Sequence, residues 1–173
     1  MKPKERLKNY PLHPSSRGYF GLALYKEMAK NDKVWLVLAD LGYKMLDMHC
    51  EDFPDRVVDC GAAECGALGV CIGLALKGKI PFFFSMTPFV LYRGYEWIRN
   101  YIDHESIPVK LVGSGRDKDY KDDSFTHECE DAKYVLDGWS NIIQFWPNEK
   151  EEIEAMVHEM VINNKPSFIS LRR

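Results

Sequence analysis

The segment from Asp59 to Pro81, DCGAAECGALGVCIGLALKGKIP, constrains the fold of this chain more than any other. Its only acidic residue after Asp59 is Glu64, and small or apolar residues surround that carboxylate on both sides. Small residues recur at steps of three and four up to Leu76, so a helix over 64–76 has a face with almost no side-chain bulk. Each glycine inside a helix costs roughly 1 kcal/mol relative to alanine, and close approach of another backbone is the compensation we expect. By itself the pattern fits a packed core helix whose acid lies at the positive end of the helix dipole.

Length and composition predict one globular domain. A chain of 173 residues with 46% hydrophobic and 28% charged residues can bury a full core without disulfides or metal. The net charge of -3 and the lack of a Lys/Arg run argue against binding to nucleic acid or to an anionic membrane. No apolar run approaches a membrane span and the start lacks the apolar centre of a signal peptide, so we expect a cytoplasmic protein.

The cysteines and histidines do not have the spacing of a metal site. The cysteines are odd in number and contain no Cys-x-x-Cys pair, so we expect five reduced thiols in the core, at Cys50, Cys60, Cys65, Cys71 and Cys129. The five histidines are scattered, and no His-Glu-x-x-His pattern occurs among them. We therefore predict no metal ligands in this chain.

Apolar runs of strand length alternate with helical patterns along the chain. We expect strands over residues 33–39, 56–60, 79–85, 108–113, 141–146 and 166–171. We expect helices over residues 18–30, 64–76, 87–102, 128–136 and 149–162, and a charged surface loop over 114–127. This alternation predicts an α/β fold, a doubly wound and mainly parallel six-stranded sheet with helices on both faces. Residues 1–15 carry prolines and mixed charges and form an arm that lies on a partner, and residues 16–173 form the domain.

Four candidate residues each follow the predicted carboxyl end of a strand, namely Asp40, Glu64, Phe89 and His127. Ligands of open α/β sheets bind at that edge, so we expect the functional site there.

The order RVVDCGAAECGALGVCIGLALKGKIPFFFSMTPFVLYRGYEWIR resembles the pyrimidine-binding domain of transketolases and related thiamine-diphosphate enzymes. In that family a strand ends in Gly-x-x-Glu and is followed by a small-residue helix, Gly-x-x-Pro, a strand and a Phe-x-x-Tyr helix start. All five parts occur here in order, and the resemblance extends from about Ser16 to Arg173.

The resemblance implies a cofactor site for thiamine diphosphate. Glu64 matches the glutamate that hydrogen-bonds the pyrimidine nitrogen and so activates the cofactor, and its apolar neighbours are expected to raise its proton affinity. Phe89 and Tyr92 match aromatics that pack on the ring, whereas without the resemblance such a pair is ordinary core. Met86 falls where the family often has another aromatic, and Asp40 is assigned to the same cofactor site.

The resemblance also implies substrate-binding residues. His127, in SFTHECED, matches the histidine of a Gly-Pro-Thr-His segment, and Asp123 aligns with the acid before it. Ser124-Phe125 replaces Gly-Pro, and a second histidine, expected near Gly115, is absent. Arg17 and Arg173 match two phosphate-binding arginines, although both also fit solvated surface charges.

Two parts of the family pattern are missing. No Gly-Asp-Gly motif occurs, so a separate subunit is expected to hold the diphosphate and Mg²⁺, and we expect this chain to lack the C-terminal third domain of the family. The resemblance therefore implies the pyrimidine-binding subunit of a split, α2β2 transketolase that moves a ketol unit between sugar phosphates. The small-residue helix suits close contact between subunits. The alternatives are a subunit of a 2-oxoacid dehydrogenase or deoxyxylulose-phosphate synthase type of enzyme, or a non-catalytic regulatory module of the same fold. The sequence names neither the ketose donor nor the acceptor.

Overall fold

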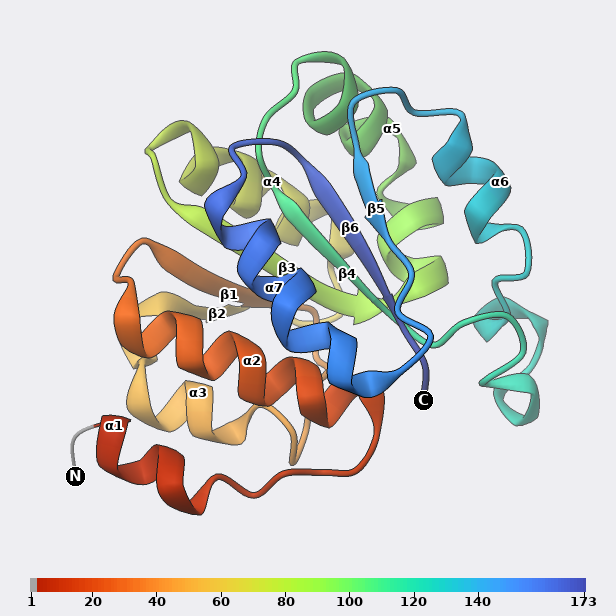
Figure 1. Ribbon diagram of the computed structural model, residues 1–173. Coiled ribbons are helices and arrows are strands. Elements are labelled where there is room, and N and C mark those ends of the chain that lie inside the picture. The colour runs from red at the N-terminus through yellow and green to blue at the C-terminus, as the bar shows by residue number, and fades with distance from the viewer. Residues whose placement is uncertain (1–2) are drawn as a thin grey trace.

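A six-stranded parallel sheet forms the centre of the molecule (Figure 1). The computed structural model describes residues 3–173. Its strands run in the order β2-β1-β3-β4-β6-β5, and every neighbouring pair is parallel. The strands are β1 (Val34–Leu38), β2 (Val57–Asp59), β3 (Ile80–Met86), β4 (Lys110–Ser114), β5 (Ile143–Phe145) and β6 (Ser167–Leu171). The predicted doubly wound α/β fold is confirmed.

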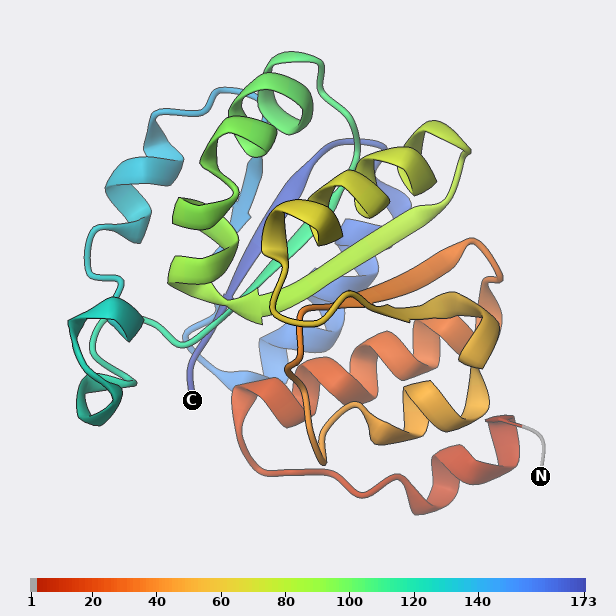
Figure 2. The same cartoon turned by 180° about the vertical axis from the view of Figure 1, so that it is seen from behind.

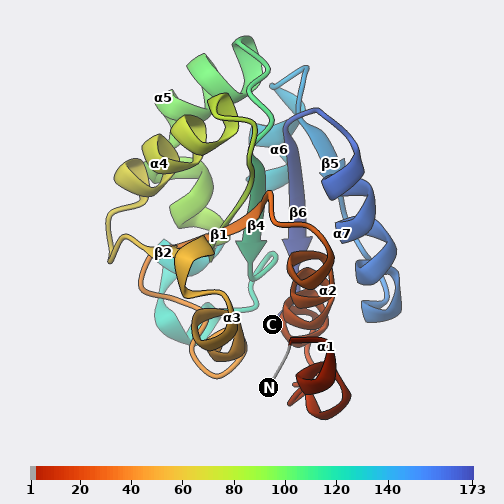
Figure 3. The same ribbon diagram turned by 90° about the vertical axis from the view of Figure 1, so that its left-hand side faces the viewer.

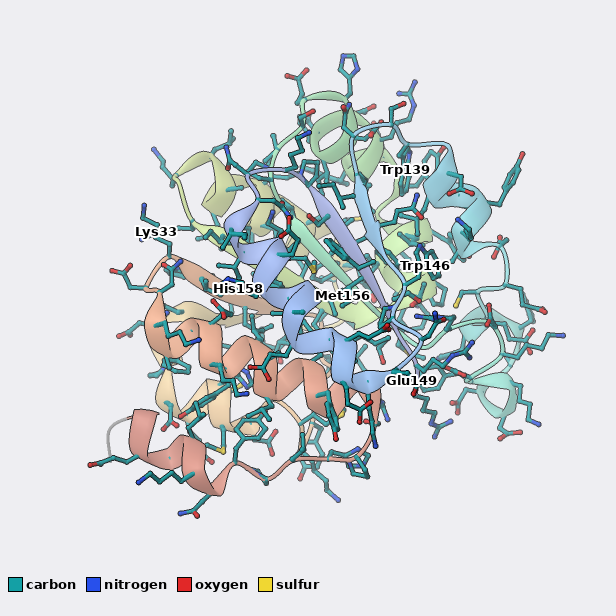
Figure 4. The ribbon with its side chains drawn as sticks, viewed as in Figure 1. Lys33, Trp139, Trp146, Glu149, Met156 and His158 are labelled. Atoms are coloured by element: carbon teal, nitrogen blue, oxygen red, sulfur yellow. The ribbon has the colours of Figure 1, made fainter. Side chains whose placement is uncertain are left out.

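Three helices cover one face of the sheet, and they are α2 (Ser16–Lys30), α3 (Asp47–Asp52) and α7 (Ile153–Ile162). The side chain of Ser15 accepts a hydrogen bond from the backbone N–H of Gly18 and so caps α2. Polar contacts join α2 to α7, and Figure 4 shows one of these residues, His158, on α7. Its Nδ1 lies 3.2 Å from Glu27 Oε1 of α2.

The other face is covered by α4 (Glu64–Leu76), by the helical stretch 89–104 and by α6 (Ala132–Asp137), as Figure 2 shows from behind. The stretch 89–104 has π-helical turns at Phe89–Arg93 and Ile98–His104, joined by α5 (Tyr95–Trp97). The view from the side in Figure 3 separates α4 and α5 from α2 and α7, with the sheet between them. Because both faces are covered, the central strands are mostly apolar and almost entirely buried, as expected for such a sheet.

Several element bounds differ from the prediction. The helix predicted over 87–102 extends to His104 and is largely π-helical, and the helix predicted over 128–136 begins only at Ala132. The helix predicted over 149–162 starts with a 3-10 turn, Lys150–Glu152. The loop predicted over 114–127 contains two 3-10 turns, Lys121–Asp123 and Phe125–His127. Local hydrogen bonds set such bounds, and apolar periodicity does not record them.

The N-terminal arm packs on its own chain. It contains α1 (Pro3–Arg6) and a 3-10 turn, Leu7–Asn9. Arg6 pairs with Asp52 of α3 at 2.6 Å, and the Tyr10 hydroxyl donates to the carbonyl of Met45 at 3.0 Å. Contact of the arm with a partner stays a prediction, and its first two residues, 1–2, lie outside the described residues.

The cysteines are all free, but they are not all in the core. Cys71 and Cys129 are buried and Cys60 is half-buried, whereas Cys50 and Cys65 are exposed. The prediction of core thiols was therefore wrong for Cys50 and Cys65, which lie on the outer sides of α3 and α4. In residues 3–173, no group of three or more His, Cys, Asp or Glu side chains is arranged to hold a metal ion. None of the helices in this range is long and apolar enough to cross a membrane.

Candidate active site

The carboxyl ends of the central strands bring several predicted site residues to one edge of the sheet. Asp40 follows β1, Met86 ends β3 and Ser114 ends β4. The segment 115–127 continues from β4 and lies near the C-terminus, beyond the same edge (Figure 2). This edge is where an open parallel sheet binds its ligands.

Glu64 is the buried acid of this edge. It begins α4, and only 5% of its surface is exposed. The Nη1 atom of Arg93 donates to Glu64 Oε1 at 2.6 Å, and about half of the Arg93 side chain is exposed. The buried carboxylate of Glu64 is thus paired with a guanidinium, that of Arg93, whose side chain is partly exposed to solvent.

Arg93 also lies on the ring of Phe89. Its guanidinium carbon is 3.7 Å from the centre of that ring, and the Phe89 ring meets the ring of His127 edge to face at 5.1 Å. Glu64, Arg93, Phe89 and His127 therefore form one continuous row of contacts. Sequence reasoning missed Arg93, although its position four residues after Phe89 in a helical stretch was a usable signal.

Tyr92 is turned toward α6. Its hydroxyl donates to Asp131 Oδ1 at 2.5 Å, and 37% of the residue is exposed. Burial, together with this hydrogen bond, raises the pKa of Tyr92 well above its ordinary value. Its predicted contact with a cofactor ring stays a prediction.

A cavity of about 290 Å³ brings four predicted site residues together, namely Arg17, Met86, Asp123 and His127. Ser114 and Tyr120 complete its polar lining, and the remaining wall is formed by Leu41, Gly42, Met45 and Phe84. The cavity has His127 in common with the row of contacts, so the two regions adjoin.

Tyr120 links the two predicted phosphate-binding arginines. Arg17 Nη1 donates to the Tyr120 hydroxyl at 3.0 Å, and the guanidinium carbon of Arg173 lies 4.8 Å from the centre of the Tyr120 ring. Arg173 Nη1 also lies 4.0 Å from Asp123 Oδ2. Sequence reasoning missed Tyr120, although it is the only aromatic residue in the charged run 114–123.

Asp40 lies beside a different hollow. It is exposed, it has a positive φ of 52°, and it lines a space of about 160 Å³ with Gly42, Cys50 and Asp59. Asp59 Oδ1 accepts from the backbone N–H of Asp40 at 3.0 Å. The structure thus places Asp40 at the same edge but outside the cavity that contains Arg17 and His127.

Comparison with known proteins identifies the family. Residues 13–173 match the model of the transketolase pyrimidine-binding domain. The chain belongs to this family. The resemblance inferred from the sequence is thereby confirmed.

Curated relatives of this pyrimidine-binding domain include split transketolase subunits. The chain is 31% identical over 70% of its length to one subunit of the apulose-4-phosphate transketolase of Actinobacillus succinogenes. It is 26% identical over 94% of its length to a putative transketolase C-terminal section of Methanocaldococcus jannaschii. It is also 26% identical over 83% of its length to the 6-deoxy-6-sulfo-D-fructose transketolase subunit SqwH of a Clostridium species. The chain covers 39%, 52% and 45% of these three proteins, so it spans about half of their length or less.

Two solved structures have the same fold. A split-gene transketolase, described as an inactive β4 tetramer, superposes with a TM-score of 0.81 at 28% identity. That match covers 92% of this chain and 51% of the other. Transketolase from Campylobacter jejuni superposes with a TM-score of 0.80 at 18% identity, over 98% of this chain and 29% of the other.

Proposed function

We propose that this chain is the pyrimidine-binding subunit of a split, thiamine-diphosphate-dependent transketolase. In this proposal the enzyme transfers a ketol unit between sugar phosphates, and its active site lies between this chain and a separate diphosphate-binding subunit. The observation that carries the proposal is the buried Glu64, which the guanidinium of Arg93 connects to the face of Phe89.

The side chains around Glu64 fit an aminopyrimidine ring. The flat guanidinium of Arg93 donates to Glu64 and lies against the face of Phe89. An aminopyrimidine is also flat, and it too can hydrogen-bond a carboxyl group while stacking on an aromatic face. Glu64 and Phe89 would then hold the ring, with Tyr92, Met86 and Asp40 as the further predicted cofactor contacts.

Each assigned side chain has a physical role. Glu64, shielded from water, would hold or release a proton at the ring nitrogen, and His127, which meets the Phe89 ring edge to face, would orient the substrate. When bound, thiamine diphosphate supplies the carbon nucleophile of the ketol transfer. Asp123, Arg17 and Arg173 surround or adjoin the cavity beside His127 and would bind the hydroxyl groups and the phosphate of the sugar.

A partner subunit completes the proposal. No Gly-Asp-Gly motif occurs in the sequence, so the partner would hold the diphosphate group and Mg²⁺, in an α2β2 assembly in the cytoplasm. The exposed small residues of α4, Gly66 and Gly73, suit a closely packed face toward that partner. The names of the split transketolase relatives support this interpretation over a 2-oxoacid dehydrogenase subunit.

Reconstitution with a diphosphate-binding subunit tests the proposal. The two subunits should bind thiamine diphosphate together and turn over ketose phosphates, whereas turnover of 2-oxoacids alone would support the dehydrogenase type. Glu64→Gln should lower kcat at least about 100-fold, because its amide cannot exchange a proton, while the complex still assembles. Glu96→Gln, an exposed position on α5, is the matched control. Full turnover by the Glu64 variant would remove this residue from the mechanism.

A further inference from the structure

The ring of Tyr120 occupies the space that a side chain at position 115 would need. Gly115 has a positive φ of 88°, and a Cβ atom built on it would overlap Tyr120 Cε2. The carbonyl of Gly115 accepts a hydrogen bond from Thr87 Oγ1 at 2.5 Å, which fixes this backbone. Position 115 is where the sequence pattern led us to expect a second substrate histidine. The ring of Tyr120, five residues further along the chain, therefore fills the space next to Gly115 that a histidine side chain at position 115 would have occupied.

The Tyr120 hydroxyl is held in place by two partners inside the cavity wall. Arg17 Nη1 donates to it at 3.0 Å, and Ser114 Oγ lies 3.1 Å from it. Tyr120 is 8% exposed and Ser114 is 2% exposed, so these contacts are shielded from water. With the phenol oxygen accepting from Arg17, its own proton can be donated to Ser114.

The charge of Arg17 is not neutralised by a neighbouring acid. Within residues 3–173, no Asp or Glu side chain lies at ion-pair distance from Arg17, whereas Arg173 approaches Asp123 at 4.0 Å. The Nε atom of Arg17 is enclosed and has no hydrogen-bond partner in the described part of the chain. A neutral phenol thus positions a cation whose charge stays available to an anion in the cavity.

We propose that Tyr120 is a positioning residue that makes this site selective for substrates with a tetrahedral oxyanion group, such as a sugar phosphate. Its ring closes the space beside Gly115, its hydroxyl holds Arg17 at the cavity wall, and its ring face supports Arg173. The role in substrate selection rests on the proposed function, and the anion site itself does not.

A phosphate titration of the 173-residue chain tests the anion site without turnover. Tyr120→Phe keeps the ring that fills the space at Gly115 and removes only the hydroxyl. We expect it to weaken inorganic phosphate binding about tenfold, as the loss of one charge-assisted hydrogen bond would, and Arg17→Met to weaken it further. Tyr101→Phe, an exposed position in the second π-helical turn, is the matched control. Absence of phosphate binding by the wild-type chain, or equal binding by the Tyr120 variant, would overturn the proposal.

Kinetics of the reconstituted complex test selectivity. With a ketose phosphate, Tyr120→Phe should raise KM about tenfold and leave kcat within about twofold, because the lost contact orients a binding group only. With the same ketose lacking its phosphate, neither constant should change. A general loss of folding would instead lower activity on both substrates equally, and that result overturns the role in selection. A wild-type complex without any transketolase turnover contradicts the proposed function, while the phosphate titration still decides the role of Tyr120.

Discussion

At the scale of single residues, Arg93 decides whether Glu64 and Phe89 are open to a ligand. Its guanidinium satisfies Glu64 Oε1 and lies on the Phe89 ring at the same time. A ligand that hydrogen-bonds Glu64 and stacks on this face of Phe89 has to displace it. Because about half of the Arg93 side chain is exposed, it can rotate into solvent without disturbing the core.

Removal of the guanidinium should therefore tighten cofactor binding. We expect Arg93→Met to lower the Kd of the reconstituted complex for thiamine diphosphate about three- to tenfold, because a partly exposed ion pair and a cation–π contact each contribute about 1 kcal/mol or less. Isothermal titration calorimetry measures this change, and Arg99→Met, an exposed position in the same helical stretch, is the control. Weaker binding by the Arg93 variant would mean that Arg93 helps to hold the cofactor.

The sequence predicted the acid of this site and not its partner. Glu64 stood out because small apolar residues surround it, and the structure buries it at the start of α4 as expected for a helix over 64–76. The π-helical turn at Phe89–Arg93 positions Arg93 next to Glu64. The spacing of apolar residues in the sequence does not reveal a π-helical turn, so this contact was not predicted. The role of Tyr120 was not predicted either, because the charged residues around it are typical of a surface loop.

At the scale of elements, two glycines at the α4 helix differ in how closely they are packed. Gly73, on α4, is open, whereas Gly94, in the helical stretch that packs on α4, is tightly enclosed. A Cβ atom on Gly73 would meet no atom within 4 Å, whereas one on Gly94 would lie 2.9 Å from the carbonyl oxygen of Val90 and would overlap Leu68. Gly94 therefore lets the helical stretch 89–104 approach α4, and Gly73 has no such role inside this chain.

Alanine substitutions should separate these two roles. We expect Gly73→Ala to stabilise the isolated chain by about 0.5–1 kcal/mol through helix propensity. We expect Gly94→Ala to destabilise it by about 1–3 kcal/mol through overpacking. Urea denaturation measures both changes. If the exposed face of α4 contacts the partner subunit, Gly73→Ala should also weaken assembly, and unchanged assembly would place the interface elsewhere.

The apolar patterns predicted the number of strands, their positions along the chain and their parallel arrangement, but not their order in the sheet. Continuous apolar runs identified them because both faces of the sheet are covered. The short helix α3 was not predicted, because its sequence, DMHCED, carries no apolar periodicity. It is held by contacts distant in sequence, such as the hydrogen bond from the Tyr25 hydroxyl to Asp52 Oδ2 at 2.5 Å.

At the scale of the whole molecule, His49 makes stability depend on pH. Its ring is fully buried and meets the rings of Tyr10 and Tyr25 edge to face, at 6.3 and 5.4 Å. Burial lowers the pKa of His49 to about 4, from an ordinary value of 6.5. Because the unfolded chain takes up this proton more readily than the folded chain, stability falls as the pH drops from about 6.5 toward 4.

The size of this effect can be measured directly. We expect the contribution of His49 to lower the free energy of unfolding by about 2 kcal/mol between pH 7 and pH 5. Urea denaturation at the two values gives the total change, which includes other groups. In His49→Phe the total should shrink by that amount, and an unchanged total would show that burial does not lower the pKa of His49 in the folded chain.

The position of β6 has a consequence for the growing chain. This strand is the last in sequence, yet it lies between β4 and β5 and hydrogen-bonds to both. During synthesis, β4 therefore keeps an open edge and β5 has no neighbour at all until residues 167–171 leave the ribosome. If synthesis stops before this point, the edge of β4 stays unpaired, and we expect the incomplete chain to aggregate through this apolar edge.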